Sequence, residues 1–305
     1  MIYTVTLNPA IDYVIRVPEF KLDELNKTTE EYKFPGGKGI NVSRILKNLK
    51  VESTNLGFVG GFTGTFIRER LAEERLITNF IEVPGDTRIN IKLKSDVETE
   101  INGQGPTIEK IHLDALKAQL LDATPEDLVV FSGSVPKGLP DDVYIELVKL
   151  VKEERIPFVV DISNDQLLDI LPFNPVLIKP NHHELAAIFN TSFNSFEEMI
   201  PYGEKLVEMG AEQVLLSMGK NGAALFNETG VYRAPGLTGT LKNSVGAGDS
   251  MVAGFVSQYV QDKDPIKAFT YGVASGSATA FSEDLALGKD ILNLVEKVKI
   301  NQVKN

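Results

Sequence analysis

The sequence contains no cysteine, which excludes disulfide bonds, thiolate nucleophiles and cysteine-based zinc sites. It has no apolar run close to the roughly 18 consecutive residues that a transmembrane helix requires. Its first residues show neither the basic region nor the apolar segment of a secretory signal. We therefore expect a cytoplasmic protein that does not insert into a membrane.

Basic residues are fewer than acidic residues in this sequence. The 305 residues include 31 Lys and Arg against 42 Asp and Glu, a formal net charge of -11. Such a chain repels nucleic acid and anionic membranes unless basic residues gather locally, so neither is an expected partner. The same repulsion acts on a phosphorylated substrate. If the protein binds one, a few Lys and Arg side chains must converge at the site, with Mg²⁺ on any nucleotide.

Short apolar runs of strand length alternate with longer segments of helical period. Predicted strands, rich in Val, Ile, Leu and Phe, span residues 2–7, 55–59, 128–132, 158–161, 176–178 and 214–217. Predicted helices span residues 39–48, 66–74, 141–154, 196–209, 250–261 and 265–281. This alternation predicts a parallel sheet wrapped by helices, whose ligands bind outside the carboxyl ends of the strands.

Three segments do not fit the buried sheet. Residues 88–94 alternate strictly, with Ile89, Ile91 and Leu93 on one face, and residues 13–17 and 28–34 are also extended in character. Period-two strands have one wet face, so we predict a small separate β-layer. It would serve as a lid over a site, as a dimer surface, or as both. The polar tail, residues 299–305, is expected to fray.

The most informative segment is Gly246-Ala247-Gly248-Asp249, which directly precedes an apolar helical run. Glycines at a helix start let backbone N–H groups point inward, and the helix dipole adds positive potential, which favours phosphate binding. A carboxylate beside such an anion site suits the removal of a proton from a hydroxyl that attacks a phosphoryl group. The alternative is that Asp249 only caps the helix.

A second glycine-rich segment contains Gly36, Gly37, Lys38 and Asn41. It differs from a phosphate-binding P-loop, because the G-x-x-x-x-G-K-[ST] spacing is absent. Its glycines permit close approach to a small polyhydroxylated ligand, and Lys38 and Asn41 supply hydrogen-bond donors. The alternative is a tight turn before a helix.

A third segment, Lys179 to Glu184, follows a predicted buried strand. The spacing of Asn181 and Glu184 places an amide and a carboxylate about one helical turn apart. Such a pair can hold waters around Mg²⁺, which prefers oxygen ligands and keeps much of its hydration shell.

Two further loops also follow strands. The turn with Ser217, Gly219 and Gly222 suits closure over a nucleotide, although an ordinary β-turn is the alternative. The loop with Ser134 and Lys137 can approach a sugar phosphate through the lysine and through backbone N–H groups.

The order of these motifs carries more information than any one of them. Asp12 after Asn-Pro, then Gly-Gly-Lys-Gly-x-Asn, Lys-Pro-Asn-x-x-Glu, Ser-x-Gly-x-x-Gly and Gly-Ala-Gly-Asp together resemble the PfkB carbohydrate kinases of the ribokinase family over nearly the whole chain. The resemblance implies a ribokinase-like α/β fold with a mainly parallel central sheet flanked by helices. It further implies one domain, residues 1–305, with a small β-sheet lid formed by segments near 12–35 and 86–105.

The resemblance also implies roles for individual residues. Asp249 would be the catalytic base, and Gly246, Ala247 and Gly248 would hold the γ-phosphoryl group of ATP. Residues implied for the sugar phosphate are Asp12, Gly36, Gly37, Lys38, Asn41, Arg88, Ser134 and Lys137, with Arg88 on the existing phosphate. Residues implied for ATP are Lys179, Asn181, Ser217, Gly219, Gly222, Ser244 and Ser275, with Asn181 and Glu184 holding Mg²⁺ through water.

Residues 85–90 and 98–106 look most like the branch of the family that phosphorylates fructose 1-phosphate at its C6 hydroxyl. Phosphorylation of tagatose 6-phosphate or fructose 6-phosphate is the alternative within the family. A sugar-phosphate sensor without turnover is an alternative from another class. The glycines of residues 57–64 lack the G-x-G-x-x-G spacing, which disfavours an oxidoreductase. A homodimer through the lid is also expected.

Overall fold

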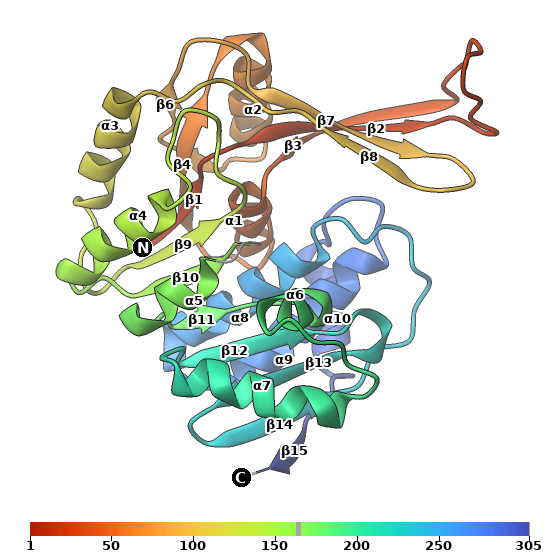
Figure 1. The fold of residues 1–305 in the computed structure, drawn as a ribbon. Helices are drawn as coiled ribbons and strands as arrows, with labels where there is room; N and C mark the ends of the chain where they lie inside the picture. Colours follow the sequence, from red (N-terminus) through yellow and green to blue (C-terminus); the bar gives the residue numbers. More distant parts are fainter. Residues whose placement is uncertain (163–165, 305) are drawn as a thin grey trace.

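The centre of the protein is an 11-stranded sheet, seen in a computed structural model that describes residues 1–162 and 166–304 (Figure 1). The strand order is β15-β14-β13-β12-β11-β10-β9-β1-β4-β5, with β6 also paired to β4. The strands are β1 (Ile2–Thr6), β4 (Ser53–Val59), β5 (Ile77–Thr78), β6 (Ile81–Glu82), β9 (Leu128–Ser132), β10 (Phe158–Asp161), β11 (Leu177–Ile178), β12 (Gln213–Ser217), β13 (Ala223–Asn227), β14 (Gly230–Ala234) and β15 (Asn301–Lys304). Pairing is parallel from β5 and β6 through to β12 and antiparallel from β12 to β15.

All six predicted apolar runs form strands in the parallel part of this sheet. Every residue of β9 and β10 is buried, as expected for strands that helices cover on both faces. The hairpin of β13 and β14, which follows β12, was not predicted. It extends the sheet with antiparallel pairs.

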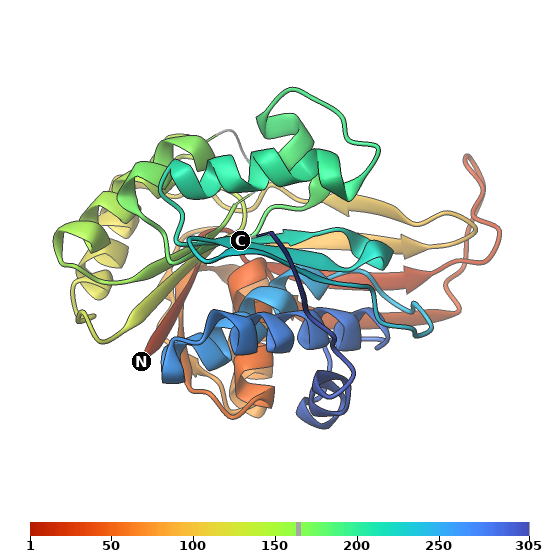
Figure 2. The same cartoon turned by 90° about the horizontal axis from the view of Figure 1, so that it is seen from below.

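Helices cover both faces of the sheet, and each face has its own apolar core (Figure 2). On one face lie α3 (Lys110–Leu120), α4 (Val143–Glu153), α5 (Leu167–Ile170), α6 (His182–Ile188) and α7 (Phe196–Glu208). On the other lie α1 (Lys38–Asn48), α8 (Ala247–Asp262), α9 (Pro265–Ala280) and α10 (Gly288–Val295). The helix α2 (Gly61–Glu73) packs against the base of the small sheet described next. No helix within the described ranges is long and apolar enough to cross a membrane.

A separate four-stranded sheet projects from the body of the protein (Figure 1). Its order is β3 (Glu30–Gly36), β2 (Ala10–Arg16), β7 (Arg88–Lys94) and β8 (Thr99–Asn102), with β2 and β7 parallel. These strands fall in the segments predicted for the second β-layer, which confirms that layer. Its buried polar side chains, Asn90 and Lys92, alternate with Ile89, which is 39% exposed.

The expectation that the C-terminal tail frays was wrong for residues 301–304, and Asn305 lies outside the described residues. Asn301–Lys304 form β15, which pairs antiparallel with β14, and Lys304 is 2.7 Å from Glu204. Polar composition suggested fraying, but an edge strand needs only backbone pairing and tolerates side chains in water. The predicted start of the helix at 250 was also late, because α8 begins at Ala247 and includes Asp249 in its first turn.

Candidate active site

A cavity of about 780 Å³ lies between the small sheet and the carboxyl ends of the central strands. The topology creates it, because parallel strands deliver their last residues to one edge of the sheet. Thr6, Ser132 and Asp161 end β1, β9 and β10 in matching register. Predicted residues that line the cavity are Asp12, Gly37, Lys38, Asn41, Arg88, Ser134, Ser244, Gly246 and Asp249.

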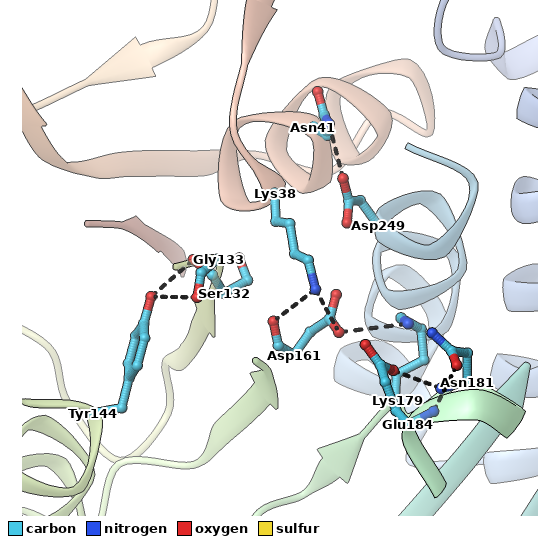
Figure 3. Close-up of polar contacts among 10 residues, drawn as sticks. All are labelled: Lys38, Asn41, Ser132, Gly133, Tyr144, Asp161, Lys179, Asn181, Glu184 and Asp249. Carbon is cyan, nitrogen blue, oxygen red and sulfur yellow. Dashed lines mark hydrogen bonds and ion pairs between the residues drawn. The ribbon is translucent and has the colours of Figure 1, made fainter. Parts of the chain in front are cut away.

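Asp249 is held in the first turn of α8. The preceding N-cap, Gly246, has φ 76°, a left-handed conformation that glycine adopts readily. Asp249 is 7% exposed, and its carboxylate accepts a 2.8 Å hydrogen bond from Nδ2 of Asn41, on α1 (Figure 3). Burial, and then the negative charge of Asp161, raise the pKa of Asp249 to about 6. Since Gly246 is the N-cap, Asp249 does not cap the helix.

Two lysines converge on Asp161 beside this carboxylate (Figure 3). Nζ of Lys38 is 3.4 Å, and Nζ of Lys179 3.5 Å, from Oδ1 of Asp161, which ends β10. Burial alone would raise the pKa of Asp161, but Lys179 and Lys38 hold it below its ordinary value. Burial disfavours the charged form of Lys38, yet Asp161 and then Asp249 raise the pKa of Lys38. Charge pairing at this buried position therefore favours the ionised forms of Lys38 and Asp161.

The first turn of α8 separates this cavity from a second one of about 400 Å³. Gly246 and Asp249 line the first cavity, whereas Ala247 and Gly248 line the second. A Cβ atom at Gly248 would lie 3.1 Å from Nζ of Lys179, so glycine allows the lysine to approach the helix end. The N–H groups of a first helical turn have no partner within the helix, so this turn suits an anion and adjoins both cavities.

The second cavity also brings together most residues predicted for a nucleotide. Ser217, Gly219, Gly222 and Ser244 line it, together with apolar side chains of α8, α9 and the loop between β14 and α8. Ser275 does not line it. A Cβ atom at Gly254 would lie 2.4 Å from Oγ of Ser275, which places this side chain in the packing between α8 and α9.

Asn181 and Glu184 form a capping box at the start of α6. Oδ1 of Asn181 accepts from the N–H groups of His183 and Glu184, at 2.9 and 2.8 Å. Oε2 of Glu184 accepts from the N–H of Asn181 at 2.7 Å (Figure 3). The two residues whose spacing suggested a magnesium site thus also cap α6. The hydrogen bond from the N–H of Asn181 fixes the direction of the Glu184 carboxylate.

Several residues that were predicted to bind the sugar lie in or beside the first cavity. Oδ1 of Asp12 accepts a 3.1 Å hydrogen bond from Asn90. Burial raises the pKa of Asp12, while Lys92 acts in the opposite direction. A Cβ atom at Gly36 would lie 2.3 Å from Oδ2 of Asp12, so this glycine makes room for the carboxylate. Gly37 has φ 113°, which admits close approach to the start of α1.

Arg88 stands at the base of β7 and reaches into the first cavity. Its Nε and Nη2 donate to the carbonyl of Asn8, at 3.2 and 2.9 Å, and Nη1 donates to Gly103 at 3.3 Å. These contacts hold the guanidinium plane in place, and burial lowers the pKa of Arg88. Lys137, by contrast, is exposed and does not line the cavity.

Sequence reasoning missed several polar residues in or beside the first cavity, among them Asp161, Asn90, Lys92 and Glu100. An acid that ends the apolar run Phe-Val-Val-Asp was a usable signal for Asp161. The polar positions of the alternating segment 88–94 were a signal for Asn90 and Lys92. Nζ of Lys92 is 2.6 Å from Oε2 of Glu100, across the β7–β8 pair.

Known proteins match the chain over most of its length. The model of the pfkB family carbohydrate kinases matches residues 5–290. A 1-phosphofructokinase of Bacillus subtilis is 50% identical, covering 99% of this chain and 100% of that protein. A D-tagatose-1-phosphate kinase of Bacillus licheniformis is 41% identical over 93% of this chain and 94% of that protein.

The fold has a solved counterpart as well. The structure of Arabidopsis thaliana ribokinase complexed with ribose and ATP superposes with a TM-score of 0.79 at 18% identity, covering 97% of this chain and 98% of that one. This confirms the predicted ribokinase-like α/β architecture. Together with the family match over residues 5–290, it leads to one conclusion: the chain belongs to the pfkB family of carbohydrate kinases.

Proposed function

We propose that this chain transfers the γ-phosphoryl group of ATP to the C6 hydroxyl of fructose 1-phosphate, giving fructose 1,6-bisphosphate and ADP. The observation that supports this reaction most strongly is the position of Asp249. It is a buried carboxylate with a raised pKa at the turn that separates two cavities. The identity of 50% to a 1-phosphofructokinase over nearly the whole chain supports this choice of sugar.

In this proposal Asp249 accepts the proton of the attacking hydroxyl. Asn41 fixes the carboxylate by its 2.8 Å hydrogen bond. The N–H groups at Gly246, Ala247 and Gly248 receive the negative charge of the transferred group, as preorganised donors do in phosphoryl transfer. Lys179 adds positive charge at Gly248, and Asp161 keeps Lys179 and Lys38 in place.

ATP would occupy the second cavity. Its apolar side chains, among them Val273 and Phe281, suit an adenine ring, and Ser217 with Gly219 and Gly222 suits the polar part of a nucleotide. The proposed site omits Ser275, which packs between α8 and α9, and Lys137, which is exposed outside both cavities.

The carboxylates of Glu184 and Asp161, near the start of α8, fit a magnesium ion. Asn181 fixes the direction of the Glu184 carboxylate, and Oδ2 of Asp161 is buried with no hydrogen-bond partner among residues 1–162 and 166–304. Carboxylate oxygens are the ligands that Mg²⁺ prefers, commonly with several waters retained. Glu184 and Asn181 would hold the ion through water, and the ion would neutralise charge on the transferred group.

Fructose 1-phosphate would occupy the first cavity. Asp12 and Lys38, beside the close backbone at Gly36 and Gly37, would hold its hydroxyls. Arg88 would bind the phosphate already present, because its planar donor fork matches phosphate oxygens and its ordered position lowers the cost of binding.

A coupled assay of ADP release tests this function. Fructose 1-phosphate should give the highest kcat/KM in a panel with tagatose 1-phosphate, tagatose 6-phosphate and fructose 6-phosphate. Tagatose phosphates are the second candidate, because a D-tagatose-1-phosphate kinase is 41% identical to this chain. A higher kcat/KM for a tagatose phosphate would show that this sugar phosphate, and not fructose 1-phosphate, is the substrate. Binding without ADP release for any sugar would favour a sensor.

The pKa of Asp249 predicts the pH dependence of turnover. The base works only when ionised, so kcat should be highest above about pH 6 and fall as the pH drops through the pKa of about 6. A kcat profile at saturating substrates between about pH 5 and pH 8 measures it. Asp249→Asn should remove this acid limb from the residual activity, and a flat wild-type profile would count against Asp249 as the base.

Exposed apolar side chains on the outer face of the small sheet lead us to predict a homodimer. Ile91 pairs with Tyr13 on β2 and with Ile101 on β8, so these apolar side chains share the face opposite the cavity. Ile101 is 57% and Ile89 39% exposed. Burial of this face against a second copy would remove it from water.

Sedimentation at micromolar concentration tests the dimer. Wild-type protein should sediment as a dimer and Ile101→Lys as a monomer. Ile111→Lys is the matched control, because Ile111 is 69% exposed on α3, outside the small sheet, and should leave the dimer intact. A monomeric wild type, or equal effects of the two substitutions, would refute the assignment.

A further inference from the structure

A row of polar side chains runs along α1 at Asn41, Arg44 and Asn48, spacings that share one helix face. Asn41 donates to Asp249, as described above. Nδ2 of Asn48 donates to the carbonyl of Ala286 at 2.8 Å. The middle member, Arg44, has no part in the proposed reaction, yet it is only 8% exposed.

Arg44 is held by two carboxylates, those of Asp284 and Glu74. Its Nη1 and Nη2 donate to the two oxygens of Asp284, at 3.1 and 2.6 Å, in a bidentate pair. Its Nε donates to Glu74, just after α2, at 2.9 Å. Bidentate arginine–carboxylate pairs fix orientation as well as distance. Arg44 therefore fastens residues 282–286, which connect α9 to α10, onto α1.

The residue next to Asp284 touches the proposed anion site. A Cβ atom at Gly246 would lie 2.7 Å from Cδ2 of Leu285, so the leucine packs directly against this glycine. A second connection runs through hydroxyls. The N–H of Ala286 donates to Oγ1 of Thr279, which is 2.8 Å from Oγ of Ser250, and Ser250 donates to the carbonyl of Gly246.

We propose that the Arg44–Asp284 pair is a positioning device for phosphoryl transfer. It seats Leu285 against Gly246 and thereby fixes the first turn of α8 in the arrangement that receives the transferred group. Arg44 and Asp284 are positioning residues, because they act through Leu285 and touch neither cavity's proposed substrate. The inference rests on the proposed function of that turn.

Asp284→Asn is the decisive variant, and Glu74→Gln is its matched control. Each replaces one carboxylate on the same guanidinium with the isosteric amide. Asp284→Asn should lower kcat at least about tenfold with KM for fructose 1-phosphate changed less than about threefold, since a misplaced catalytic group costs turnover more than binding. Glu74→Gln should keep kcat within about twofold of wild type, because Glu74 does not adjoin the α8 turn.

Hydrogen exchange gives a readout that does not depend on turnover. Peptides covering residues 244–252 should exchange faster in Asp284→Asn than in wild type, and Glu74→Gln should leave them unchanged. If Asp284→Asn does not fold, Leu285→Ala decides the question. It removes the contact with Gly246 but keeps the ion pair, and it should show the same loss of kcat at nearly constant KM.

Equal effects of Asp284→Asn and Glu74→Gln on both kcat and exchange would reduce Arg44 to a structural ion pair and overturn the proposal. Unchanged kcat in Leu285→Ala would overturn it as well. Failure of the proposed function is recognised separately, because wild-type protein would then release no ADP with any sugar phosphate, whereas the exchange measurement would remain informative.

Discussion

Asp249→Asn lowers kcat about 10²–10⁴-fold, the usual contribution of a positioned general base, with little change in fold or in ATP affinity. Asparagine keeps the volume of the side chain but cannot accept the proton of the attacking hydroxyl. The carboxylate is buried against Asn41 and bears a raised pKa of about 6, so it is poised to take up a proton near neutral pH. Steady-state kinetics with both substrates saturating measure the loss.

A purely structural contribution of Asp249 predicts a much smaller effect. An acidic residue in a first helical turn stabilises the helix by about 0.3–1 kcal/mol through the dipole. Asp290 occupies such a turn in α10, outside both cavities, so Asp290→Asn is the matched control. If the two variants lose activity to the same small extent, Asp249 is not the base.

Arg88→Ala raises KM for fructose 1-phosphate about ten- to a hundredfold and leaves KM for ATP nearly unchanged. A charge-assisted contact contributes roughly 1.5–3 kcal/mol, which corresponds to that change in affinity. The guanidinium lines the sugar cavity and is held by the carbonyls of Asn8 and Gly103, away from the second cavity. Residual activity on unphosphorylated fructose should change little, since no phosphate is present there.

Arg68→Ala controls for the loss of an arginine near the same end of the protein. Arg68 lies on α2 in an exposed pair with Glu82 at 3.4 Å, which is worth at most about 1 kcal/mol. It should leave both Michaelis constants unchanged. Equal losses on fructose and on fructose 1-phosphate in Arg88→Ala would show that Arg88 supports the sheet and does not bind phosphate.

The central sheet was predictable because its strands are continuous apolar runs, such as the wholly buried β9 and β10. The tail strand β15 was not, because Asn301–Lys304 are exposed and only the backbone of β14 makes them a strand. Pairing across the hairpin of β13 and β14 likewise depends on tertiary contacts. Local sequence does not specify which strand an edge strand will pair with.

The candidate site shows the same division. Local motifs identified Asp249, Lys38 and the glycines around them, because close backbone approach requires specific residues at specific positions. The motifs did not identify Asp161, whose importance comes from the two lysines, 123 and 18 residues distant, that it pairs with. The convergence of positive charge expected from a net charge of -11 is formed by Lys38, Arg88, Lys92 and Lys179, without Lys137.

The chemical identity of the product tests the proposed reaction most directly. Wild-type protein is incubated with ATP, Mg²⁺ and fructose 1-phosphate, and the mixture is followed by phosphorus NMR. We expect a new phosphomonoester signal at C6, beside the retained one at C1, formed in equal amount to ADP. ADP without a C6 phosphate, or no conversion of fructose 1-phosphate while a tagatose phosphate is consumed, would contradict it.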